Sequence, residues 1–142
     1  MPARPVVLAP DAELVAVDVL RSGLAVRPES YVAGAKVGTR MPAATAPGRY
    51  LLVRRVGGTM AGLVFDEPRL DVLVWHEDDA GRVRLANLAR AVLLAAPGST
   101  PLGVAVYRVE EFAGPVNLPD PLNETRTVTL FTVAIRLRAA PA

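Results

Sequence analysis

Apolar residues recur near the start of the chain at the spacing of one face of an α-helix. They stand at positions i, i+3, i+4, i+7 and i+8, which places one apolar stripe against a core: Ala12, Val15, Ala16, Val19 and Leu20. Asp11 precedes the stripe and is expected to cap the helix, because its carboxylate accepts a free backbone N–H at the positive end of the helix dipole. Gly23 is expected to end the helix.

A second stripe with helical spacing predicts a helix that begins at Asp78 or Asp79 and reaches Ala96, before Pro97-Gly98. Its predicted core side comprises Leu85, Leu88, Ala89, Val92, Leu93 and Ala96.

Two apolar residues of this second helix, Val83 and Leu94, fall on the opposite side. They lie there beside Asn87 and Arg90. This position predicts that Val83 and Leu94 meet something outside the subunit.

The segment between the two helices is typical of β-strands. Arg49–Val56 predicts a strand, Gly57-Gly58 a glycine-rich hairpin loop ending near Gly62, and residues 63–69 a second strand. Residues 70–75 continue or restart that strand, with apolar side chains on both sides. Both sides of it are therefore expected to be covered.

The C-terminal part shows the clearest alternation of the chain. One predicted face carries Thr127, Thr129, Phe131, Val133, Ile135 and Leu137. The other carries Val128, Leu130, Thr132, Ala134, Arg136 and Arg138. At about 3.3 Å per residue such a strand is on the order of 40 Å long, so part of it is expected to extend beyond its parent sheet or to pair with another chain.

Two segments lack clear periodicity and are expected to be long connections. Residues 27–47 contain three prolines and two glycines, with one short strand expected near Tyr31–Val37. Residues 112–122 form a proline-rich excursion after a predicted strand at Val104–Glu110. The resulting order α, β, β, β, α, β, β predicts an α+β fold with a mostly antiparallel β-sheet and two α-helices packed on one face.

Composition narrows this picture without naming a function. The 142 residues are 51% hydrophobic, which suits one domain over residues 1–142 and excludes general disorder. The net charge is only +2, so a pI near 9.5 is weak evidence for nucleic-acid binding. Cysteine is absent, which removes thiolate chemistry, and no apolar run is long enough to predict a membrane span.

The candidate chemistry is sparse. The run His76-Glu77-Asp78-Asp79 is the one place where the single histidine meets carboxylates, but consecutive residues cannot converge on one ion, and helix capping explains the acids. The glycines at 57, 58 and 62 match no phosphate-binding motif. Trp75 is expected in the core rather than in a ligand cage. The sequence therefore predicts no catalytic residue, no cofactor site and no metal site.

Several short motifs resemble those of one known family. They are Val53-Arg54-Arg55-Val56-Gly57-Gly58, Asp71-Val72-Leu73-Val74-Trp75, Ala95-Ala96-Pro97-Gly98, Gly114-Pro115-x-x-Leu118-Pro119-Asp120 and Arg126-x-x-x-Leu130-x-x-x-x-Ile135-Arg136. The chain from about Asp11 to Leu137 resembles the tail terminator (tail completion) proteins of actinobacterial phages with long noncontractile tails. Residues 27–47 contribute little to the resemblance.

The resemblance implies a structural virion protein and not an enzyme. Such a subunit is expected to form a ring, hexameric in the family, at the head-proximal end of the tail tube, where it stops tube polymerisation. Its expected partners are further copies of itself, the tail tube protein and the head-tail connector or stopper proteins, with DNA only as cargo through the bore. A ring needs two different contact patches on each subunit.

The candidate interface residues combine the outer side of the second helix, the 112–122 segment and the adjacent arginines 54 and 55, which alternate between strand faces. They are Arg54, Arg55, Val83, Arg90, Leu94, Phe112, Leu118 and Asp120. Two alternatives stay open: a head-tail connector, stopper or tail-tube subunit, or a small cytoplasmic enzyme or ligand-binding domain that uses His76.

Overall fold

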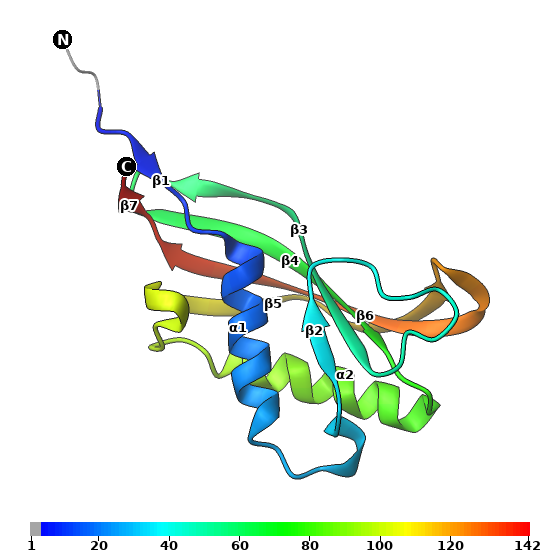
Figure 1. Cartoon of the computed structure of the whole chain (residues 1–142). Helices are drawn as coiled ribbons and strands as arrows, with labels where there is room; N and C mark the ends of the chain where they lie inside the picture. Colours follow the sequence, from blue (N-terminus) through cyan, green and yellow to red (C-terminus); the bar gives the residue numbers. More distant parts are fainter. Residues whose placement is uncertain (1–3) are drawn as a thin grey trace.

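The computed structural model describes residues 4–142, and a five-stranded sheet with two helices on one face forms its centre (Figure 1). The strand order is β2-β3-β4-β6-β5, in which only β2 and β3 run parallel. The main strands are β2 (Lys36–Gly38), β3 (Tyr50–Ala61), β4 (Phe65–Trp75), β5 (Val106–Asp120) and β6 (Asn123–Arg138). Two short strands, β1 (Val7–Leu8) and β7 (Ala140–Pro141), pair the two ends of the chain. The predicted α+β class and mostly antiparallel sheet are confirmed.

Helix α1 (Ala12–Ala25) begins where the sequence predicts, because Asp11 Oδ1 accepts a hydrogen bond from Leu14 N at 3.1 Å. The prediction that Gly23 ends the helix is wrong. A Cβ at Gly23 would lie 2.4 Å from Val92 Cγ1, so the absence of a side chain lets the second helix approach closely.

Helix α2 (Asp79–Leu94) is capped by Asp78, whose Oδ2 accepts from Gly81 N at 2.7 Å. It ends two residues before the predicted Ala96, which is buried nonetheless. Leu85, Ala89 and Leu93 are buried on the predicted core side, against the apolar face of the sheet.

The β3–β4 hairpin corrects the predicted loop at Gly57-Gly58. Strand β3 runs through both glycines to Ala61, with a β-bulge between Arg55 and Gly57, and Gly62 lies in the turn. Strand β4 is one continuous strand that includes Pro68, opposite Gly58. The bulge explains why two glycines stand inside a strand, since both have positive φ.

The predicted proline-rich excursion at 112–122 is also corrected. Most of it belongs to β5, whose pairing with β6 is interrupted by register shifts around Ala113 and again before Asp120. These irregularities accommodate the prolines of an edge strand. Beyond the pair Val74–Thr129, β6 has no partner on β4. Residues 118–128, here called the arm, thus form a two-stranded extension beyond the parent sheet, as predicted (Figure 1).

The 27–47 connection is more ordered than its composition suggests. It contains a short 3₁₀ turn, Ser30–Val32, and then β2, which is shorter than the predicted strand near Tyr31–Val37. Lys36 N donates to Arg49 O at 2.9 Å, which starts the parallel pairing with β3.

Both faces of β4 are covered, as the sequence predicts. Leu70, Val72 and Val74 are buried under the helices. On the other face Trp75, only 2% exposed, packs with Leu73, Leu52 and Val128. The prediction that Trp75 belongs to the core is confirmed.

Candidate functional site

A row of exposed apolar side chains follows β5, an edge strand of the sheet. The row, here called the edge row, comprises Tyr107, Phe112, Val116 and Leu118, which are 48%, 54%, 50% and 39% exposed. Within residues 4–142, the backbone of β5 pairs on its outer side only near Val106, with Gly98 and Ser99. Exposed apolar residues in this arrangement are typical of a protein contact surface.

The edge row points to the helix-free face of the sheet. Phe112 lies beneath Arg69, whose Cζ is 4.1 Å from the ring centroid, and Tyr107 meets Phe65 edge to face at 5.0 Å. In the register, Val116 and Leu118 lie opposite Leu130 and Val128 of β6.

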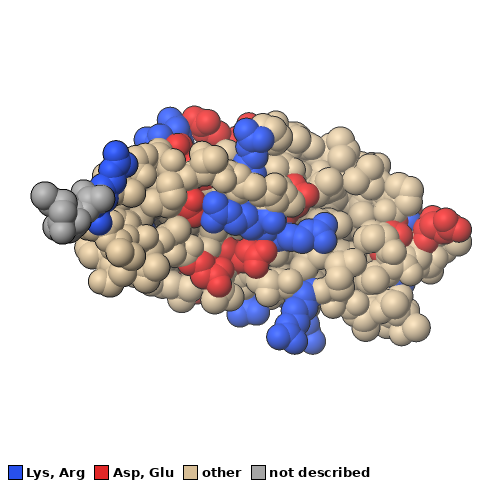
Figure 2. Space-filling model, turned by 90° about the horizontal axis from the view of Figure 1, so that it is seen from above, with Lys and Arg blue, Asp and Glu red and all other residues tan. Residues whose placement is uncertain are grey.

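Charged side chains also lie on the helix-free face, beside the apolar cluster around Trp75. Figure 2, the view from above, shows basic side chains across the middle of the molecule with acidic side chains beside them. Glu67 Oε2 accepts from Arg136 Nη2 at 2.9 Å and lies 3.3 Å from Arg108 Nη2. Glu67 therefore neutralises part of the positive charge of this face, whereas Arg54 and Arg69 there form no ion pair within the described chain.

A buried carboxylate anchors the arm to the sheet. Asp120 is 2% exposed, and its Oδ2 accepts from Trp75 Nε1 at 2.9 Å and from Arg126 Nε at 3.0 Å. Its Oδ1 accepts from Leu122 N at 2.8 Å. Arg126 also donates to Ala44 O at 2.5 Å, so the arm and the 39–48 loop are held together over Trp75.

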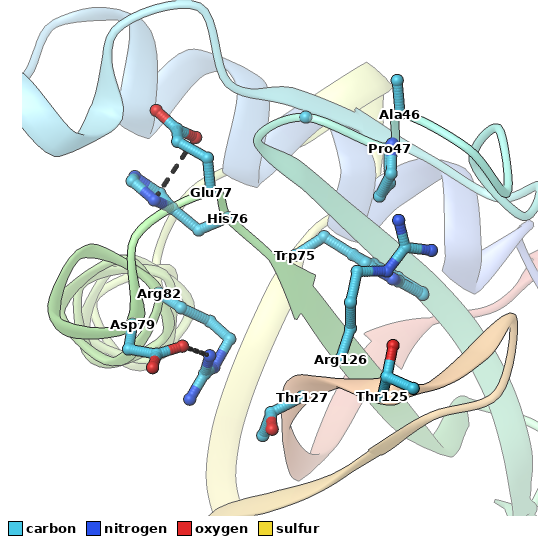
Figure 3. Close-up of a pocket in the computed structure, with 11 residues that line it drawn as sticks. Ala46, Pro47, Trp75, His76, Glu77, Asp79, Arg82, Thr125, Arg126 and Thr127 are labelled. Atoms are coloured by element: carbon cyan, nitrogen blue, oxygen red, sulfur yellow. Dashed lines mark hydrogen bonds and ion pairs between the residues drawn. The ribbon is translucent and has the colours of Figure 1, made fainter.

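A cavity of about 530 Å³ lies beside this junction, between the 39–48 loop, the start of α2 and the start of β6 (Figure 3). Its charged groups are already engaged. Arg82 donates from Nη1 to Asp79 Oδ1 at 2.6 Å and from Nε to Thr129 Oγ1 at 3.1 Å, while Arg126 is paired with Asp120. These contacts make the cavity a polar junction between elements.

His76 at the edge of this cavity uses both ring nitrogens within the fold. Its Nδ1 accepts from Asp78 N at 3.0 Å, and its Nε2 lies 3.1 Å from Tyr31 O, to which it donates. Neither nitrogen is left to ligate a metal or to accept a proton from a substrate.

Glu77 beside His76 is an ion-pair partner of Arg49. The hydrogen bond from Arg49 Nε, at 2.8 Å, is the main cause that lowers the pKa of the Glu77 carboxyl to about 2. Arg49 also donates to Ser30 O and Ala33 O, so this contact ties the 3₁₀ turn to the start of α2.

Replacing Glu77 with glutamine is expected to lower the free energy of unfolding near neutral pH by less than about 1 kcal/mol, because the carboxylate is largely exposed. The pKa of Glu77 is depressed in the fold, so its contribution is present above the ordinary value of 4.5 and is lost as the pH falls toward about 2. Urea unfolding of both proteins across this range measures the difference. A difference that stays constant down to pH 2 would contradict the assignment.

The structure divides the candidate interface residues into two groups. The first group lies on α2 and consists of the half-buried Val83 and Arg90 and the exposed Leu94. Arg90 Nη2 donates a hydrogen bond to Glu111 Oε2 at 2.6 Å, which joins α2 to the β5 edge. Phe112 and Leu118 belong to the edge row on the same strand. These residues therefore occupy one edge of the molecule.

The second group lies on β3, away from that edge. Arg54 is exposed on the helix-free face, opposite Asp71 in the register. Arg55 points to the other face and forms a bidentate pair with the buried Asp66, at 2.8 and 3.0 Å. The prediction that the two side chains face opposite ways is confirmed, and Arg55 is engaged within its own subunit.

Asp120 is corrected as a candidate interface residue. Its carboxylate is buried and accepts three hydrogen bonds from its own chain, so it is not presented to a partner. The sequence contained one signal for the hydrogen bond between Asp120 and Leu122 N. An Asp between two prolines favours a turn in which its carboxylate accepts a hydrogen bond from the backbone N–H two residues ahead. Nothing in the local sequence indicates the contact with Trp75.

Comparison with known proteins gives no family model and no curated protein that matches this chain. Within residues 4–142, no His, Cys, Asp and Glu side chains gather in a group of three suited to a metal ion. In the same part of the chain, neither helix has the length and apolar character needed to cross a bilayer.

Proposed function

We propose that this protein is a structural subunit of a phage tail, a tail terminator that forms a ring, hexameric by the family resemblance, at the head-proximal end of the tail tube. The ring stops tube polymerisation and joins the tail to the head-side connector, with DNA passing through its bore. The protein then acts in the virion, after assembly in the host cytoplasm. This mechanism is steric and adhesive and needs no catalytic group.

The edge row is the observation that carries this proposal. Four exposed apolar side chains along one free edge leave a surface that suits a protein partner better than water. The bulges of β5 oppose open-ended strand addition, so the contact is made by side chains. Leu94 and Val83 on α2 lie at the same edge, on the face that the helices cover. Arg54 on β3 offers a second, separate contact site, as a head-to-tail ring requires.

The decisive experiment mixes the purified protein with purified tail tubes and follows tube length by electron microscopy and particle mass by sedimentation. We expect the protein to bind tube ends, to stop further elongation and to be found there as a ring. Binding to portal complexes without tube binding would indicate a connector instead. A compact monomer that ignores tail tubes would contradict the proposal.

Leu94→Asp is expected to weaken ring formation by at least about tenfold, because a charge would replace an apolar side chain in the contact. Leu94 is 38% exposed in the single subunit, so the variant is expected to fold. Arg84→Ala, an exposed change on the same helix, is the matched control. Equal assembled mass for wild type and both variants, with the same fraction folded by circular dichroism, would remove α2 from the interface.

A further inference from the structure

A basic hollow on the β2 edge gathers three cations that have no acidic partner within the described part of the molecule. It is a cavity of about 570 Å³ whose lining includes Arg21, Lys36 and Arg40 and no carboxylate. Half of the basic residues pair with an acid within the subunit: Arg27, Arg49, Arg55, Arg82, Arg90, Arg108, Arg126 and Arg136. The three cations of the hollow have no carboxylate within 4.0 Å among residues 4–142, so the hollow suits an anionic group.

Contacts within the fold hold the hollow in shape before any partner binds. Arg21 donates to Val37 O from Nη2 at 2.7 Å and from Nε at 3.2 Å, which leaves Nη1 without a partner in the described chain. The Tyr50 hydroxyl crosses β2 and donates to Arg40 O at 2.6 Å. A Cβ at Gly38 would lie 2.4 Å from that hydroxyl oxygen, so glycine is needed there for Tyr50 to reach Arg40.

The acidic residues offer a matching group on the arm. Of the fourteen Asp and Glu side chains, only those of Asp18 and Glu124 make no hydrogen bond or ion pair among residues 4–142. Asp18 is half-buried in the wall of a groove between α1 and α2. Glu124 is exposed at the tip of the arm, next to a turn ordered by Asn123, whose Oδ1 accepts from Thr125 N at 3.1 Å.

The hollow and the arm lie at the same end of the sheet, with the hollow on the β2 edge and the arm leaving from the β6–β5 edge, although Arg126 of the arm also reaches Ala44 of the 39–48 loop. β2 pairs with the first residues of β3, and Tyr50 there lies opposite Trp75 at the end of β4. The arm leaves the sheet just beyond Val74–Thr129, on the edge formed by β6 and β5 (Figure 1). When copies stand side by side in the same orientation, the arm of one therefore comes level with the hollow of the next.

We propose that this hollow receives Glu124 of a second copy, so that the arm tip of each subunit docks on the β2 edge of its neighbour. The inference rests on the ring assembly of the proposed function and adds its lateral contact. The three cations and one carboxylate then form a charge-assisted contact whose strength falls with rising salt.

The test is a charge swap read out by oligomer mass, in solution and on tail tubes. Glu124→Arg is expected to weaken self-association by about tenfold or more, because like charges then meet. Arg40→Glu is expected to weaken it less, because a carboxylate enters the hollow while Arg21 and Lys36 remain. The double variant that carries both changes is expected to associate better than Glu124→Arg alone, because the introduced arginine then faces a carboxylate in the hollow. Arg138→Glu, an exposed cation at the other end of the sheet without an acidic partner in the described chain, is the matched control and is expected to have little effect.

The other outcomes separate this inference from the proposed function. If both single variants assemble as well as the wild type, the proposed arm contact is wrong, whereas the proposed ring assembly is unaffected. If Arg40→Glu alone weakens assembly, or if a fluorescent DNA duplex binds the wild type and not Arg40→Glu, the hollow binds another anion and the Glu124 assignment is overturned. If the wild type assembles neither alone nor on tubes, the proposed function falls, and this contact with it.

Discussion

Replacing Asp120 with alanine is expected to destabilise the protein by about 3 kcal/mol and to release the arm from the sheet. The substitution leaves the buried Trp75 Nε1 without an acceptor and removes the ion-pair partner of Arg126. An unsatisfied buried donor costs about 1–3 kcal/mol, and the loss of one member of a buried ion pair adds to this. Arg126 is partly exposed and regains water, which limits the total.

Trp75 is the only tryptophan, so its fluorescence reports directly on this junction. We expect Asp120→Ala to shift its emission to longer wavelength and to lower the urea midpoint, with faster hydrogen exchange across residues 118–128. Thr127→Ala, an exposed position in the same arm whose side chain makes no hydrogen bond in the described chain, is the control and is expected to change stability by no more than about 0.5 kcal/mol. Equal stability of the two variants would show that Asp120 does not anchor the arm.

Replacing Gly58 with alanine is expected to cost about 3 kcal/mol or more. Gly58 has a φ of +98°, and a Cβ there would lie 2.1 Å from Glu67 O and 2.6 Å from Pro68 Cα. Both are backbone atoms of the adjacent strand, so no side chain can move aside. The cost combines an unfavourable backbone conformation with displacement of β4 beside the β3 bulge.

Gly62→Ala is the matched control for this change. Gly62 has a φ of +61°, but no atom lies within 4 Å of the position that a Cβ would take. We therefore expect only the cost of the unfavourable backbone conformation, about 1 kcal/mol. Thermal unfolding of both variants measures the difference. A Gly58→Ala protein as stable as the Gly62→Ala protein would contradict the close strand approach.

Periodicity and capping residues predicted the elements best. Asp11 and Asp78 cap their helices because capping depends on residues only three apart. The burial of both faces of β4 follows in the same way from its apolar residues on either side. These are local patterns, and a short stretch of sequence contains all the information they need.

The errors arose where one residue type serves two purposes. Glycine is common at the end of a helix, yet Gly23 lies within α1, where the lack of a side chain lets Val92 of α2 pack closely against it. Pro115 and Pro119 are typical of a loop, yet an edge strand with irregular pairing accommodates them. The local sequence does not show whether such a glycine or proline ends an element or lies within one, because the residue that it packs against belongs to another element.

The sequence by itself determined the helices, the alternating strands, the apolar core and the overlong final strand, because each depends on side-chain spacing within one segment. Only the tertiary structure decided which strand is an edge, that the arm is anchored through Asp120 to Trp75, 45 residues away, and that Arg126 reaches Ala44, 82 residues away. It also decided which charges stay unmatched, because pairing between distant residues depends on how the chain closes on itself.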